Sequence, residues 1–182
     1  MLLPGMLLAA VQAIAPAPLS SGEVTFAMKA TKVNDFTGRA PVAAASFTGT
    51  DVLNVTGAVQ IRVADMRTGI GLRDSHLRNA MHAERFPTID FRLVGVDPQP
   101  PRGDTIPMTF QGPLTIHGVT HTVRVPGWAI LRPGGAEIHA AFPIDMRQYG
   151  IDPPSRFLGA VRVDPVTEVS VRLVFGSSQE PR

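Results

Sequence analysis

Cysteine is missing from the 182-residue chain, which excludes disulfides, thiolate metal sites, cysteine nucleophiles and lipid attachment through a thiol. Lysine occurs only twice, and the 15 arginines are spread without a run, so the net charge is only +2. This balance gives no electrostatic footprint for nucleic acid. The sequence also lacks a G-x-S-x-G elbow, an H-E-x-x-H zinc motif and a glycine-rich phosphate loop. We therefore expect no cofactor, no catalytic residues and no nucleic-acid partner.

Charge is absent from residues 1–22, where an apolar run lies between positions 2 and 11. The run is too short to span a bilayer. Small residues follow it, as they do before the cleavage site of a secretory signal, although the positive start of such signals is missing. We interpret residues 1–21 as a signal peptide or apolar leader and predict a periplasmic or secreted protein. A mis-assigned start or a disordered leader is the alternative.

From residue 23 onward, apolar and polar residues alternate with a period of two, which in a β-strand places them on opposite faces. The alternation predicts at least seven half-buried strands, at 23–30, 59–64, 89–93, 106–116, 119–125, 138–144 and 168–175. It continues through Pro107 and Pro113, which we expect at a strand edge or bulge because proline has no N–H to donate. Strands with one apolar face are typical of antiparallel sheets, so the chain should form an all-β barrel or sandwich.

Turn-forming residues separate these strands at 34–35, 54–57, 98–103, 117–118 and 133–135. One stretch, 74–86, has no alternation. Asp74 or Ser75 can cap a helix there, Leu77 and Met81 share a face, and Pro87 prevents continuation. The sequence predicts one short helix that covers an end of the barrel.

Histidines and charged pairs are the remaining candidates for chemistry. His117 and His121 flank a predicted turn and come nearest to the spacing of zinc ligands, although hydrogen-bonded histidines around a hairpin are the simpler interpretation. His76 and His82 are six residues apart, roughly 120° around a helix, which does not suit a shared ligand. Arg147 beside Tyr149 could hold a polar head group.

Five separated motifs resemble the YceI-like family in order and spacing over residues 22–176. They are Thr68-Gly69, Arg73-Asp74-x-His76-Leu77, Phe86-Pro87-x-Ile89-x-Phe91, Gly112-x-Leu114-Thr115-Ile116-x-Gly118-Val119-Thr120 and Arg147-x-Tyr149-Gly150-Ile151. The resemblance implies one domain over residues 22–176, a tail at 177–182, and an extended antiparallel lipocalin-like β-barrel of about eight strands with a helical cover. It also implies export and the binding of isoprenoid or other amphiphilic lipids. The chain departs from the family at Lys29-Ala30-Thr31, where members often carry a histidine, and at 41–46, where a glycine-rich segment is usual.

A barrel of about eight strands has an interior that is either filled by side chains or open for one ligand, and the sequence leaves both alternatives open. Methionine and phenylalanine at inward positions suit a pliable apolar lining. We expect a non-enzymatic protein that binds the long apolar chain of an isoprenoid, quinone-like or fatty lipid, for carriage, storage or sensing. The candidate ligand-binding residues are Phe26, Met28, Ile61, Phe91, Leu93, Met108, Phe110, Leu114, Ile116, Trp128, Phe142, Arg147 and Tyr149.

Two other classes of function remain as alternatives. One is an enzyme or metal-dependent protein that uses a histidine and a carboxylate, and the other is a structural partner of a membrane redox protein. Transient contact with a membrane is compatible with lipid binding, and a homodimer is one option for the oligomeric state.

Overall fold

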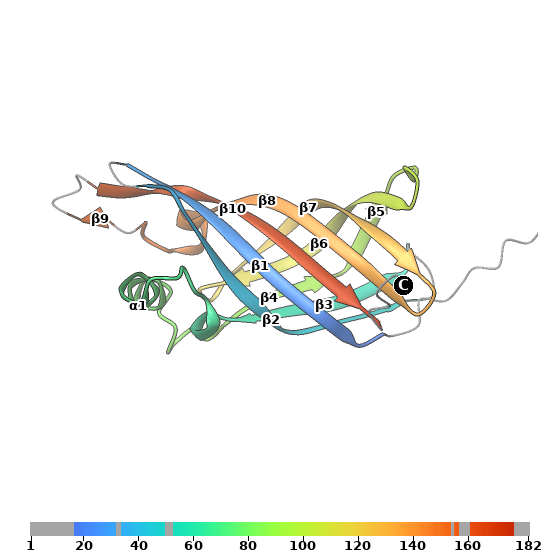
Figure 1. Ribbon diagram of the computed structural model, residues 1–182, viewed down its shortest axis with the longest axis horizontal. Helices are drawn as coiled ribbons and strands as arrows, with labels where there is room; N and C mark the ends of the chain where they lie inside the picture. The colour runs from blue at the N-terminus through green and yellow to red at the C-terminus, as the bar shows by residue number, and fades with distance from the viewer. Residues whose placement is uncertain (1–16, 32–33, 50–52, 154, 157–160, 177–182) are drawn as a thin grey trace, which may run out of the picture.

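A computed structural model describes residues 17–31, 34–49, 53–153, 155–156 and 161–176. Strands dominate it (Figure 1). Their bounds are β1 Leu19–Ala30, β2 Phe36–Gly49, β3 Val55–Arg62, β4 Thr88–Leu93, β5 Gly95–Pro98, β6 Thr105–Ile116, β7 Val119–Arg132, β8 Gly135–Asp145, β9 Ser155–Arg156 and β10 Val161–Phe175. One α-helix, α1 Gly71–Ala80, and two 3₁₀ turns, Val63–Asp65 and Met146–Tyr149, complete the described elements. None of the described helices is long and apolar enough to cross a membrane.

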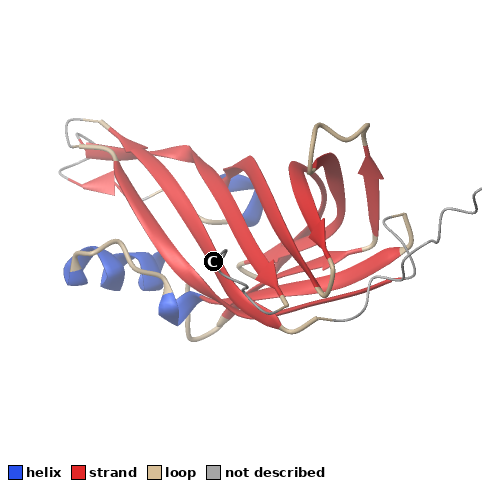
Figure 2. Cartoon of the chain, turned by 45° about the vertical axis from the view of Figure 1, so that its right-hand side comes forward, coloured by secondary structure: helices blue, strands red, loops and turns tan. Residues whose placement is uncertain are grey.

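Eight strands form a closed antiparallel ring in the order β1-β2-β3-β4-β6-β7-β8-β10, and β10 returns to pair with β1. The two short strands lie off this ring, with β5 paired to β6 and β9 paired to β10. The ring is visible as a long, tilted barrel in Figures 1 and 2. This arrangement confirms the predicted lipocalin-like barrel. It also places the two ends of the described chain together, because the Ser20 hydroxyl donates to the Gly176 carbonyl oxygen.

Pro107 and Pro113, the two prolines of β6, lie where the pairing of β6 with β4 and β5 is interrupted, as their missing N–H groups predict. Phe91 of β4 pairs with Leu114 of β6, and Gly95 of β5 pairs with Gln111 of β6. Three residues lie between Phe91 and Gly95, whereas only two lie between Gln111 and Leu114. The extra residue makes a bulge opposite Pro113. Pro107 lies just beyond the last β5 pair, and its carbonyl accepts a bond from Gln99 N at 2.8 Å. Each proline therefore avoids the place where an N–H would be needed.

The helix begins and ends earlier than predicted, at Gly71 and Ala80 instead of 74 and 86. Asp74 does not cap it. Its carboxylate accepts bonds from the backbone N–H and hydroxyl of Thr68, both at 2.6 Å, and so fixes the loop that leads into the helix. The chain leaves the helix through His82, whose positive φ of 43° cannot continue it. Residues 81–85 are turns.

The turn at 117–118 is confirmed as a two-residue hairpin loop between β6 and β7. Both of its residues have positive φ, 52° at His117 and 76° at Gly118. This is the turn geometry that matches the twist of paired strands. The turn predicted at 54–57 is wrong, since β3 already begins at Val55.

Candidate functional site: an apolar cavity inside the barrel

One end of the barrel contains a cavity of about 810 Å³. Inward side chains of the eight ring strands line most of its length, and they are almost all aliphatic, aromatic or methionine. The cavity volume lies within the range of ordinary small-molecule sites. With so few polar groups, the cavity can bind a ligand mainly through burial of apolar surface.

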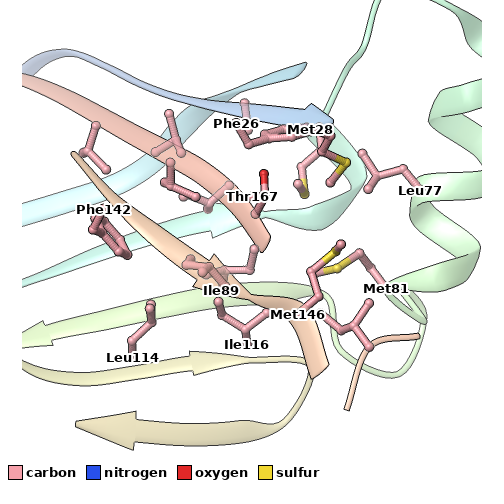
Figure 3. A pocket seen from close by; sticks show the side chains of 18 of the residues that line it. Phe26, Met28, Leu77, Met81, Ile89, Leu114, Ile116, Phe142, Met146 and Thr167 are labelled. Atoms are coloured by element: carbon pink, nitrogen blue, oxygen red, sulfur yellow. The ribbon is translucent and has the colours of Figure 1, made fainter. Parts of the chain in front are cut away.

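The width of the cavity is set by layers of residues from neighbouring strands. In one such layer, Val169 of β10 pairs with Phe26 of β1 on one side and with Phe142 of β8 on the other. Phe26 lies flat against β2, because Gly38 opposite it has no side chain; a Cβ there would lie 2.1 Å from the Phe26 ring. The glycine therefore leaves room for the Phe26 ring, which Figure 3 shows among the side chains that line the cavity.

The opposite end of the barrel interior is filled. Leu93, Met108, Phe110, Val125 and Ala129 form a separate cluster, in which Leu93 is only 1% exposed. The cavity reaches Phe110 and Val125 but not the other three residues. The interior is thus packed around Leu93, Met108 and Ala129, and the cavity runs beside this cluster as far as Phe47 and Leu173.

Eight of the predicted ligand-binding residues line the cavity: Phe26, Met28, Ile61, Phe91, Phe110, Leu114, Ile116 and Phe142. The other five do not. Leu93 and Met108 belong to the packed end. The structure places Trp128, Arg147 and Tyr149 outside the cavity lining.

Trp128 lies on the outer face of β7, beside a shallow depression over β1, β8 and β10. Its ring stacks on that of His139, with 3.9 Å between centroids. His139 Nε2 lies 2.8 Å from a carboxylate oxygen of Glu137, which also accepts a bond from Arg172. The hydrogen bond with His139 holds the pKa of Glu137 below its usual value, and Arg172 lowers that pKa further. Trp128 belongs to this external network.

Arg147 and Tyr149 lie in the 3₁₀ turn after β8. The Arg147 guanidinium binds the Asp145 carboxylate at 2.6 Å and lowers its pKa, and most of the arginine side chain faces solvent. Tyr149 is buried, and its burial raises the pKa of its phenol. Its ring meets the edge of His121 with 5.0 Å between centroids. These residues fix the turn, whose Met146 reaches the cavity.

The helix α1 crosses the mouth of the cavity. Leu77 and Met81 extend from it and from the turn that follows it, toward Met28 and Met146 (Figure 3). This cluster of methionine and leucine can change shape easily, because methionine has three rotatable bonds and no branch. The helix with its methionines forms a deformable cover.

Most of the polar groups that line the cavity lie at this same end, and the sequence did not single them out as ligand contacts. They are Asn34, Thr68, Arg73, His76 and Asp152. The Arg73 guanidinium lies 4.2 Å from the centre of the Phe36 ring, in a cation–π contact. Deeper inside, the hydroxyl of buried Thr167 donates to Ala27 O at 2.9 Å. A ligand with a polar head and an apolar tail therefore matches the distribution of polarity.

The histidines of the hairpin are hydrogen-bonded, as the simpler interpretation predicts. His117 Nδ1 donates to Tyr149 O at 3.1 Å, since a carbonyl can only accept, and His121 Nε2 donates to Gln148 O at 2.9 Å. His117 Nε2 lies 3.1 Å from His82 Nδ1. Within the described part of the chain, no three histidine or carboxylate side chains are grouped in a way that could hold a metal ion.

A closed antiparallel barrel with an internal apolar cavity is a lipocalin-like, ligand-binding architecture. The profile of the YceI-like domain matches residues 17–175, and the chain belongs to this family.

Several solved structures share the fold. BcnA of Burkholderia cenocepacia is 17% identical, with a TM-score of 0.69 over 84% of this chain and 95% of that one. A polyisoprenoid-binding domain from Saccharophagus degradans, implicated in plant cell wall breakdown, is 13% identical, with a TM-score of 0.68 over 90% and 98%. The YceI protein of Campylobacter jejuni is 13% identical, with a TM-score of 0.59 over 81% and 88%. No curated protein sequence matches the chain significantly.

Proposed function

We propose that the protein is an exported, non-enzymatic carrier that holds the apolar chain of an amphiphilic lipid in its barrel. The observation that carries this proposal is the cavity itself, which is long and mainly apolar and has most of its polar groups near α1. The similarity to a domain described as polyisoprenoid-binding supports an isoprenoid or related chain. Export is supported by the apolar, uncharged leader at residues 1–21.

The eight cavity-lining residues named above are proposed to contact the chain, with the layer of Phe26, Val169 and Phe142 at its middle. The head group is proposed to lie beside Arg73 and His76. A chain of ten methylenes would contribute roughly 8 kcal/mol on burial, before the cost of ordering. Useful affinity is therefore possible without one specific hydrogen bond to the tail.

The first test is to purify the protein from its native host without detergent, and to compare its native mass with a mass spectrum of its organic extract. We expect one class of amphiphile at close to one molecule per chain. The matched control is the Phe91→Arg/Phe110→Arg variant, which places two charges in the lining. A folded double variant that still carries the same lipid would refute an internal site.

A further inference from the structure

The mouth of the cavity is bordered by an apolar pair that nothing in the described structure covers. Ile70 and Leu72 are 51% and 66% exposed, and they lie two residues apart at the start of α1. Leu72 is one helical turn before His76, which lines the cavity, so the two side chains share a helix face. The exposed pair is thus continuous with the rim of the cavity.

The segment that carries this pair is firmly attached to the barrel. Arg67 of the preceding loop exchanges two backbone bonds of 2.8 Å with Arg39 of β2. The Asp74 carboxylate ties the helix back to Thr68. Ile70 and Leu72 are therefore held outward on a rigid support.

The segment that carries the pair has an excess of basic residues. Between residues 66 and 81 the sequence has three arginines, Arg67, Arg73 and Arg78, and a single acid, Asp74. The acid is 6% exposed and hydrogen-bonded inward, within electrostatic range of Arg67 and Arg78. The segment beside the mouth is therefore apolar at its start and basic along the helix, and Asp152 is an acid on the cavity lining at the same end. This is the pattern that binds an anionic bilayer surface, with apolar side chains among the acyl chains and arginines on the phosphates.

We propose that the α1 end of the barrel docks on an anionic phospholipid bilayer, with Ile70 and Leu72 inserted and Arg67 and Arg78 on lipid phosphates. Docking places the mouth against the membrane, so that a long chain moves between bilayer and cavity without crossing water. That use rests on the proposed function, but the docking itself does not depend on an occupied cavity.

The test is flotation of lipid-stripped protein with vesicles of phosphatidylcholine alone or mixed with phosphatidylglycerol. We expect binding to the mixed vesicles that falls as salt is raised. The variant Ile70→Ser/Leu72→Ser should weaken it at least tenfold, and Arg78→Gln about fivefold. The matched control is Val94→Ser/Leu131→Ser, which removes two aliphatic side chains that are 57% and 40% exposed and lie away from α1. The control should bind as the natural protein does.

A second measurement uses the absence of cysteine. A polarity-sensitive dye on Leu72→Cys should shift to shorter emission wavelength with anionic vesicles, whereas the same dye on Leu131→Cys should not. Equal shifts at both sites, no flotation, or a dimer that buries position 72 without binding vesicles would each overturn the docking.

Loading of the cavity is measured separately, with a water-soluble fluorescent fatty chain. Vesicle binding through Ile70 and Leu72 without uptake of the chain would refute the proposed function and leave the docking surface intact. Uptake of the chain without vesicle binding would refute the docking surface and leave the proposed function intact.

Discussion

Lengthening the apolar chain of a bound amphiphile should strengthen binding by about fourfold per methylene until the cavity is full. The cavity wall is apolar along the barrel, and the Thr167 hydroxyl inside it is already satisfied by Ala27 O. Each added methylene should therefore contribute close to the full transfer free energy of about 0.8 kcal/mol. Four methylenes then contribute about 3.2 kcal/mol, which is roughly a 200-fold change in Kd.

The assay is displacement of a fluorescent fatty probe from lipid-stripped protein by a series of straight-chain alcohols, checked by calorimetry. The logarithm of Kd should fall linearly with chain length and then level off when the 810 Å³ are occupied. A negative heat-capacity change should accompany the linear part, because apolar surface is being buried.

The substitution Val169→Phe adds four carbon atoms within the layer that contains Phe26 and Phe142. It should leave the slope unchanged and move the plateau to chains shorter by at least about four carbons. Val166→Phe makes the same change at an exposed position of the same strand, and should move nothing. Kd values that do not depend on chain length, or equal effects of the two variants, would refute the cavity as the site of the chain.

Three further predictions concern stability and titration. Leu93→Ala should lower the free energy of unfolding by about 2–5 kcal/mol in urea without altering the increment per methylene, because Leu93 lies in the packed end. Asp74 accepts hydrogen bonds from Thr68, and these bonds lower the pKa of Asp74 in the folded state. The contribution of Asp74 to stability is therefore present above its unfolded pKa near 3.8 and is lost as pH falls through its folded pKa. Asp74→Asn should accordingly be less stable than the natural protein at pH 7, and the difference should shrink in urea titrations as pH falls below 3.8. Tyr149 is the only tyrosine, and ultraviolet titration of its phenolate should give a midpoint above 10 that returns to about 10 on unfolding. Since the unfolded phenol loses its proton first, stability should fall across that alkaline range, and a midpoint at or below 10 in the folded protein would contradict the burial.

Seven strands were predictable because each has one face in the barrel and one in solvent. Apolar and polar residues therefore alternate along each of these strands. Strand β2 was not predictable, because its buried inward positions include Gly38 and Ala40. These residues are too small to produce a clear alternation of apolar and polar side chains. Their small size makes sense only with the structure in view, where the Phe26 ring occupies the space beside Gly38.

The candidate site was predictable in part for the same reason. Alternation identifies inward residues, and eight of those named line the cavity. It cannot say which inward residues face open space and which are packed, as Leu93 and Met108 are, since that depends on side-chain volumes summed over several strands. Trp128 could have been placed from sequence, because it has the opposite parity to buried Val125 and Ala129. Arg73 and His76 reach the rim through the path of the helix across the barrel end, which no local pattern specifies.

The pairing of β1 with β10 has a consequence for how the protein is made. The residues that pair between these two strands are far apart in the sequence: Val24 lies opposite Val171, and Phe26 lies opposite Val169. Long-range pairing of this kind slows folding, since the chain must close a large loop before the contact is gained. During synthesis, β1 is complete long before its partner exists, and its backbone groups on that side stay unpaired. The contact that seals the finished barrel thus leaves a long strand edge open to other chains until the last strand arrives.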